Sequence, residues 1–323
     1  MATIHRKQLE LDILIKAAEI VKKGEGIDPR ELTNREKAAM IDALRAKHPL
    51  NELLAMMDMP KSSYFYQREA QRWPEKYTAL RAWVKRVFAE SRSCYGYRRI
   101  HAAIRSAGMV ISEKVIRRIM QEEQLVVPCS KKKRRYSSYN GEITPAVDNL
   151  VARDFHAARP NEKWLTDLTE LHIPAGKVYL SPMIDCFDGM AVSWAIGTSP
   201  DAELVNTMLD DAIAGLQHGE RPIVHTDRGC HYRWPGWVSR MEEAGLTRSM
   251  SRKGCSPDNA ACEGFFGRIK NEMFYDRSWA DVPIDRFIDE LDSYLRWYNE
   301  ERIKMSLGAK SPKVYRQSIG LTA

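Results

Sequence analysis

The chain has 323 residues, 44% of them hydrophobic, and a formal net charge of +7. This length supports one sizeable core and one or two smaller domains. No apolar run approaches the roughly 18 residues of a membrane span, and the polar, basic start is not typical of a secretory signal. We therefore expect a cytoplasmic protein with no membrane partner.

The charge is unevenly divided along the chain. Residues 1–150 contain 29 Lys and Arg against 18 Asp and Glu, whereas residues 151–323 contain 21 against 25. A basic front half joined to a mildly acidic back half is typical of a polyanion-binding part attached to another function. Nucleic acid is the leading partner.

The six cysteines form no CxxC pair. The sequence therefore indicates neither a disulfide framework nor a zinc ribbon, and we expect reduced, mostly buried thiols.

The first 72 residues are expected to be helical. Ile4, Leu11 and Ala18 recur every seven residues, which indicates either a short coiled coil or a helix packed on its own chain. Two short helices then flank the break at 59–61, and the second is polar, with Ser62 as its N-cap. This pattern predicts a helix-turn-helix in which Ser62 and Tyr64 contact DNA, and a plain three-helix bundle is the alternative.

A second helical unit follows, with helices in KYTALRAWVKRVFAE, YGYRRIHAAIRSAG and VISEKVIRRIMQEEQL. Arg98 and Arg99 are assigned to phosphate contacts, although solvated helix faces would also account for them. Five adjacent cations come next, and they repel one another unless they meet phosphates. We assign them to the DNA backbone: Lys131, Lys132, Lys133, Arg134 and Arg135.

The back half changes to strand periodicity. Alternating residues predict antiparallel strands over 163–173, 178–187 and 190–197. Helices over 201–217 and 234–244 then alternate with strands over 221–227 and 246–250, and a last helix begins at Ser256-Pro257. The order predicts an α/β fold with mixed strand directions.

Three acids in this half are candidates for one site. Asp167 shares strand parity with apolar residues, where a carboxylate needs a compensating cation, and Asp227 ends its own strand, where a turn role is the alternative. Glu263 lies on the last helix in a stripe with Asn259 and Lys270, at the spacing of one helix face. An ordinary amphipathic helix, capped by Asn259, would also explain that stripe. Asp185 competes with Asp167 for the first position.

Residues 33–316 resemble a known family. Asp227 and Glu263 are separated by 35 residues, as in the integrase superfamily, and four segments are most similar to bacterial insertion-sequence transposases of family three. These segments are PNEKWLTDLTEL (160–171), HTDRGCHY (225–232), GCSPDNAACEGFFGRIKNE (254–272) and YLRWYNEERIKMSLGAKSPKVYR (294–316). Many relatives carry histidine where Lys304 stands, so its role stays open.

The resemblance implies a ribonuclease-H-like catalytic core preceded by all-α helix-turn-helix units. The expected domains are a short helical or coiled-coil segment (1–30), a helix-turn-helix (31–72), a second such unit (73–127), a basic linker (128–150), the integrase-like core (151–300) and a tail (301–323).

The implied activity is that of a DNA transposase, with single-strand cleavage at transposon ends and strand transfer by the 3′-hydroxyl, in a copy-out and paste-in order. Asp167, Asp227 and Glu263 would hold two Mg²⁺ or Mn²⁺ ions, with Asp167 shared, and Lys270 would bind phosphate. The implied partners are the terminal inverted repeats and target DNA, further copies of the chain in a dimer or higher oligomer, and an upstream-encoded zipper protein. A nuclease of the ribonuclease H type and a helix-turn-helix regulator are the alternatives.

Overall fold

The computed structural model describes residues 2–21, 32–72, 77–127 and 145–321. The chain separates into two compact units, residues 1–80 and residues 81–323, and each is described by itself. Within the described ranges, no helix is both long and apolar enough to cross a membrane.

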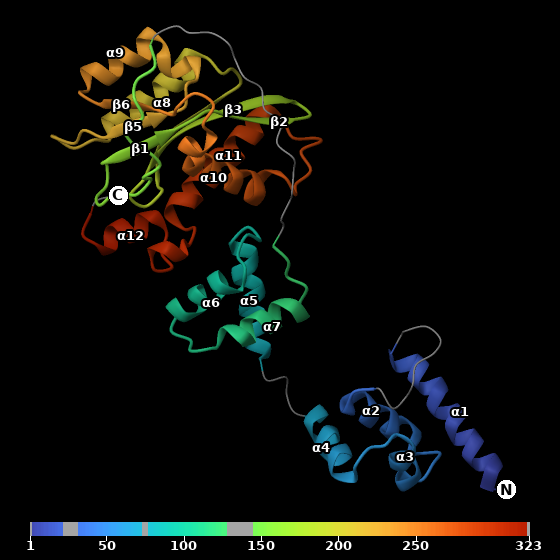
Figure 1. The fold of residues 1–323 in the computed structure, drawn as a ribbon. Helices are drawn as coiled ribbons and strands as arrows, with labels where there is room; N and C mark the ends of the chain where they lie inside the picture. The colour runs from blue at the N-terminus through green and yellow to red at the C-terminus, as the bar shows by residue number, and fades with distance from the viewer. Residues whose placement is uncertain (1, 22–31, 73–76, 128–144, 322–323) are drawn as a thin grey trace. The chain divides into compact units, whose positions relative to one another are not determined.

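The described residues of the first unit include α1 (Ala2–Val21), α2 (Asn34–Leu44), α3 (Leu50–Met56) and α4 (Lys61–Arg72) (Figure 1). Leu9 and Ile13 of α1 are buried in the same core as the apolar residues of α2 and α3, whereas Leu11 and Leu14 are half-exposed. The helix thus packs on its own chain through one face and leaves part of the predicted heptad seam at the surface.

Helices α3 and α4 flank the tight turn at residues 57–60, where Asp58 adopts a left-handed conformation with φ of 46°. Helix α4 begins at Lys61, so Ser62 lies within the first turn of α4. This corrects our expectation that Ser62 is the N-cap. The geometry is compatible with a helix-turn-helix, and DNA binding by this unit stays a prediction.

The second unit opens with α5 (Thr78–Glu90), α6 (Tyr97–Ser106) and α7 (Glu113–Glu122). Their apolar faces are spaced for helix packing, and they bury Val84, Ile100, Ile104 and Ile116 completely. The loop between α5 and α6 docks on the C-terminal part of the chain. There the Tyr95 hydroxyl donates to the Glu301 carbonyl at 3.3 Å and accepts the Ile303 N–H at 2.7 Å.

A mixed sheet forms the centre of the second unit. Its strands are β1 (Lys163–Thr166), β2 (Thr169–Ile173), β3 (Gly176–Asp185), β4 (Ala191–Gly197), β5 (Ile223–Thr226) and β6 (Thr247–Met250). The strands β1, β2 and β4 run antiparallel to β3, and β5 runs parallel to both β1 and β6. The single strand expected over 163–173 is divided at Asp167-Leu168, and its two parts pair with successive halves of β3.

Helices cover both faces of this sheet (Figure 1). The helices α8 (Ala202–Ala214) and α9 (Pro235–Glu243) pack against one face, and α10 (Ala260–Ile269) and α11 (Ile284–Glu300) lie on the other. Trp164 belongs to the core under α8 and α9, whereas its neighbour Leu165 points to the opposite face, as the strand period requires. The short helix α12 (Pro312–Ser318) follows α11. The fold is the expected ribonuclease-H-like α/β core preceded by helices.

The helix that carries Glu263 differs at both ends from the expected one. Ser256 and Pro257 lie in a 3₁₀ turn, η3 (Ser256–Asn259), so α10 begins only at Ala260. After Ile269 the helix widens into a π-helical turn, η4 (Lys270–Phe274). Such turns are frequent at functional sites.

Candidate active site

Two aspartates leave the sheet at neighbouring positions. The strands β1 and β5 are parallel and pair Leu165 with His225, so the residues two positions further on, Asp167 and Asp227, follow the ends of adjacent strands. Side chains at the carboxyl ends of adjacent parallel strands meet at one edge of the sheet. The sequence identified both residues, and their pairing depends on the sheet order.

Protein groups orient both carboxylates. The Leu168 N–H donates to Asp167 Oδ1 at 2.7 Å, and the Gly229 N–H donates to Asp227 Oδ1, also at 2.7 Å. A Cβ at position 229 would lie 2.8 Å from Asp227 Oδ1, so a larger residue there would displace the carboxylate. Glycine at this position is therefore part of the site.

The electrostatics of the two carboxylates are those of a crowded acidic site. Burial raises the pKa of Asp167 to about 7, with a further rise from the charge of Asp227 and a smaller one from Glu263. Burial also raises the pKa of Asp227. Like charges held close together disfavour ionisation, and a cation relieves that cost.

Glu263 approaches from the first turn of α10, the helix that packs on β1. Its charge raises the pKa of Asp167, so the two acids are near each other. The paired strands bring Asp167 and Asp227 together, and the membership of Glu263 in the same site stays a prediction. Among the described residues, however, no group of three or more His, Cys, Asp or Glu side chains is arranged to hold one metal ion.

Asn259 contacts the first carboxylate of the site. Its side chain caps no helix, which contradicts our expectation, and instead Nδ2 donates to Asp167 Oδ2 at 2.8 Å. The residue is buried between η3 and α10, where it reaches the carboxylate across 92 positions of sequence. The DN pair before the helix was the available signal, but sequence alone gives no partner for the amide.

The loop that presents Asn259 is fixed by buried polar contacts. Asp258 is fully buried and accepts from Arg153 Nε at 2.8 Å and from Arg252 Nε at 3.0 Å. His225 is also buried, and its ring bonds to Ser249 Oγ and to the Asp258 carbonyl, both at 2.9 Å. Burial lowers the pKa of His225, so the imidazole ring makes these hydrogen bonds in its neutral form.

Lys270 lies at the start of the π-helical turn, just beyond α10. Burial lowers its pKa, while the charges of Glu170 and Asp167 act in the opposite direction. The assignment of Lys270 to a substrate phosphate stays a prediction.

Asp185 does not belong to this edge. It pairs with Trp164 at the start of β1, whereas Asp167 follows the end of that strand. Its carboxylate is fully buried and accepts from Arg316 at 2.8 Å. The competing acid is therefore part of a structural ion pair.

The residues assigned to DNA divide into three groups. Ser62 and Arg98 are exposed, so their assignment stays a prediction, and the linker residues Lys131 to Arg135 lie outside the described residues. Tyr64 is fully buried, and its hydroxyl donates to Asp42 at 2.6 Å, so our assignment of this residue to DNA was wrong. Arg99 of α6 is half-buried, with its guanidinium over the Tyr95 ring and near Glu272, and its assignment to phosphate stays a prediction.

Lys304 lies outside the acidic edge as well. Its ammonium donates to the Asp188 carbonyl and stands 5.8 Å from the centre of the Tyr298 ring. Gly189 has φ of 70°, and a side chain there would collide with this ammonium.

Family models match most of the second unit. An integrase core domain matches residues 157–256, a second integrase core model matches 263–319, and an HTH-like domain matches 75–133.

Three relatives are similar over long stretches. The probable transposase for insertion sequence element IS1353 of Shigella flexneri is 58% identical over 98% of this chain and 61% of its own length. The putative transposase InsK for IS150 of Escherichia coli K12 is 37% identical over 86% of this chain and 96% of that protein. Transposase InsF for IS3A of the same organism is 30% identical over 71% and 79%. The chain thus spans about three fifths of the first relative and nearly all of the second. These matches confirm the resemblance, and the chain belongs to the family of bacterial insertion-sequence transposases with an integrase core domain.

Proposed function

We propose that this chain cleaves one DNA strand at each transposon end and joins the freed 3′-hydroxyl to a second site. The observation that carries the proposal is the position of Asp167 and Asp227 at the ends of paired parallel strands, with the charge of Glu263 acting on Asp167. Three carboxylates suit metal-assisted phosphoryl transfer, in which water or a DNA hydroxyl supplies the attacking oxygen.

The donor set fits Mg²⁺ or Mn²⁺, because all three side chains offer oxygen and their mutual repulsion favours a bound cation. Asp167 lies under the influence of both other acids, so it would be shared between two ions, with Asp227 and Glu263 each holding one. With two ions, each ion needs only Asp167 and one other acid as protein ligands. This proposal is therefore compatible with the described part of the chain, where no group of three side chains is arranged to hold one metal ion. When bound, the two ions would polarise the attacking oxygen and stabilise the leaving one.

The protein groups supply orientation. Asn259 and the Leu168 N–H fix the two oxygens of Asp167, and the Gly229 N–H fixes Asp227. Lys270 would bind a phosphate next to the scissile bond. In the first step, a water oxygen bonds to phosphorus, the P–O3′ bond breaks, and the 3′-oxygen leaves as a hydroxyl after taking a proton. In the second step, that hydroxyl loses its proton and displaces a 3′-oxygen from another phosphodiester.

The proposal includes one cut per end. The segment between Asp227 and Glu263 is occupied by η2 (Cys230–Arg233), α9, β6 and η3, which leaves no room for an additional domain beside the acids. One set of carboxylates would then cut one strand, and the 3′-hydroxyl would attack the same strand beyond the other end. The product would be a branched circle, as in a copy-out and paste-in order.

DNA binding would be shared by the helical units ahead of the core. The relatives are named as transposases for insertion sequence elements, and from this we infer terminal repeats and target DNA as partners. The exposed side chains of Leu11 and Leu14 favour a further copy of this chain, or a zipper protein encoded upstream, as a partner of α1. We place this activity in the cytoplasm, on the bacterial nucleoid.

A two-ended plasmid incubated with the protein and Mg²⁺ tests the reaction. We expect nicks at both ends and a strand-joined branched circle, without replication proteins. A linear element cut on both strands would contradict one-strand cleavage. Degradation of RNA–DNA hybrids without joining would favour the nuclease, and DNA binding without any cut would favour the regulator.

A further inference from the structure

A cavity of about 640 Å³ lies beside α10, on a different flank from Glu263. It is bounded by the segment 155–158, the turn after β3, the residues 304–307 and α12, all within the second unit. Its volume falls within the range of roughly 300–1,000 Å³ that is usual for small-molecule sites. None of the acids assigned to catalysis lines it.

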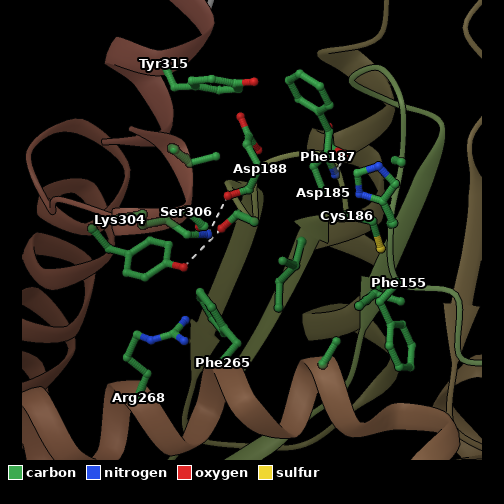
Figure 2. Close-up of a pocket in the computed structure, with 18 of the residues that line it drawn as sticks. Phe155, Asp185, Cys186, Phe187, Asp188, Phe265, Arg268, Lys304, Ser306 and Tyr315 are labelled. Carbon is green, nitrogen blue, oxygen red and sulfur yellow. Dashed lines mark hydrogen bonds between the residues drawn. The ribbon is translucent and has the colours of Figure 1, made fainter. Parts of the chain in front are cut away.

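The helix α10 divides its residues between the two sites. Ala261, Phe265 and Arg268 line the cavity at the spacing of one helix face, whereas Glu263 is absent from its lining and is assigned to the acidic edge. In Figure 2, Phe265 and Arg268 rise from the helix along the bottom of the view toward the cavity. A ligand in the cavity would therefore contact the helix that carries a catalytic acid.

Aromatic rings make up much of the wall. Phe187 and Tyr315 face each other in the upper part of Figure 2, with ring centres 5.8 Å apart and planes inclined by 38°. Phe155, Phe265 and Tyr298 add three further rings to the lining. Rings arranged around a cavity are the usual platform for a nucleobase, because every base has a π-face.

Two cationic side chains, Arg268 and Lys304, line the cavity together with the aromatic rings. Arg268 is partly exposed, and among the described residues it makes no hydrogen bond or ion pair. Lys304 directs its ammonium to the Asp188 carbonyl and, within the same described set, pairs with no carboxylate. Both groups are thus available to a phosphate, and a guanidinium can bind it through two N–H groups.

The two acids in the lining, Asp185 and Asp188, are already paired with an arginine. Asp185 and Asp188 are buried, and both accept from Arg316, at 2.8 Å and 2.7 Å respectively. With Arg316 opposing these two acids, Arg268 and Lys304 leave the neighbourhood with a net charge of +1, counting His156 as neutral. An anionic ligand with an aromatic part fits this balance better than a neutral or cationic one.

We propose that the cavity binds one nucleotide of the DNA substrate, with its base among the rings of Phe187 and Tyr315 and its phosphate on Arg268 and Lys304. The nucleotide comes from an unpaired or extruded position, because a base within a duplex cannot enter a cavity of this kind. The choice of DNA as the source rests on the proposed function, whereas the nucleotide chemistry rests on the cavity. Binding here holds the strand against α10 while the acidic edge acts on a neighbouring phosphodiester.

Calorimetric titration of the full chain with dAMP, without divalent metal, tests the site. We expect saturable binding, with inorganic phosphate and deoxyadenosine each at least about tenfold weaker, because each offers only one of the two contacts. If phosphate binds as tightly as dAMP, the cavity is only an anion site. If deoxyadenosine binds as tightly as dAMP, Arg268 and Lys304 do not contribute to binding. If dAMP does not bind, the proposal is wrong.

Variants locate the binding. Arg268→Ala and Tyr315→Leu should each weaken dAMP about tenfold, whereas Arg268→Lys should retain part of the affinity and report on folding. Arg286→Ala, which removes an exposed arginine on α11, is the matched control. Unchanged affinity in both pocket variants would place the binding elsewhere. Asp167→Asn should bind dAMP like the unmodified chain, so the result stands whether or not the proposed catalysis is correct.

Discussion

The side-chain amide of Asn259 donates a hydrogen bond of 2.8 Å to the carboxylate of Asp167. The bond connects the turn before α10 to the end of β1, so the helix that carries Glu263 and the strand that leads to Asp167 are held in one arrangement. A group that orients a metal-binding carboxylate matters nearly as much as the ligand itself.

Replacement of this amide should therefore reduce catalysis. We expect Asn259→Ala to lower Mg²⁺-dependent strand cleavage by about 10- to 100-fold, because Asp167 loses its orienting donor. Gln217→Ala, which removes an exposed amide beyond α8, should leave the rate unchanged. Cleavage rates measured over a range of Mg²⁺ concentrations check this, and a normal rate in Asn259→Ala would make the bond merely structural.

The raised pKa of Asp167 predicts a pH dependence of stability. Because its pKa is about 7 in the fold and near 3.8 when unfolded, the folded chain binds more protons between these values. The metal-free protein should therefore lose stability as the pH rises from about 4 to about 7. Asp167→Asn removes the group, so its melting temperature in EDTA should exceed that of the unmodified protein more at pH 8 than at pH 5.

Asp210→Asn serves as the control for this comparison, because Asp210 is an exposed acid paired with Arg240 on the surface. It should show no such pH-dependent gain. An equal effect of Asp167→Asn at both pH values would mean that Asp167 titrates normally.

A buried ion pair lies beside the loop between α5 and α6, whose Cys94 thiol donates to the Glu272 carbonyl at 3.6 Å. Arg302 is 2% exposed as a side chain and donates from Nε to Glu272 at 2.7 Å, while the Tyr294 hydroxyl donates to the same carboxylate at 2.8 Å. Glu272→Gln leaves the arginine buried without its counter-charge, so we expect a loss of about 3 kcal/mol or more in the free energy of unfolding.

Glu290→Gln is the matched change at the surface, where Glu290 pairs with Arg277 and Arg286. It should cost no more than about 1 kcal/mol. Chemical denaturation of the three proteins measures both values, and equal small losses would show that the Glu272 pair contributes little.

The first unit offers a test that separates stability from recognition. Tyr64 is buried and bonded to Asp42 and Arg45, so Tyr64→Phe should cost about 1 kcal/mol of stability and leave DNA affinity unchanged. Ser62 is exposed on the same helix, so Ser62→Ala should weaken DNA binding a few-fold without a stability loss. Melting curves and binding isotherms distinguish the two, and the opposite pattern would restore Tyr64 as a DNA contact.

The sequence predicted those features that depend on local spacing. Alternation identified the strands, and the position of Asp167 among apolar residues marked it as anomalous. The break at Asp167-Leu168 was missed because both halves of the strand keep the same alternation. Tyr64 was misassigned because three consecutive aromatic residues, 64–66, give no sign of which one faces the core.

Long-range contacts explain the remaining differences. The bond from Asn259 to Asp167 joins residues 92 positions apart, and no pattern within either segment predicts it. The cavity beside α10 is assembled from seven separated segments, and its cations look like ordinary surface residues in the sequence. Asp185 could be told from Asp167 only once Arg316, 131 positions later, was placed beside it.

The most direct test of the account is Mg²⁺-dependent cleavage and joining by Asp167→Asn, Asp227→Asn and Glu263→Gln. Each change removes one charge at nearly constant size, so each variant should lose both reactions while binding DNA with near-normal affinity. Asp210→Asn should remain active as the surface control. Substantial cleavage by any one of the three variants would remove that residue from the active site and contradict the account.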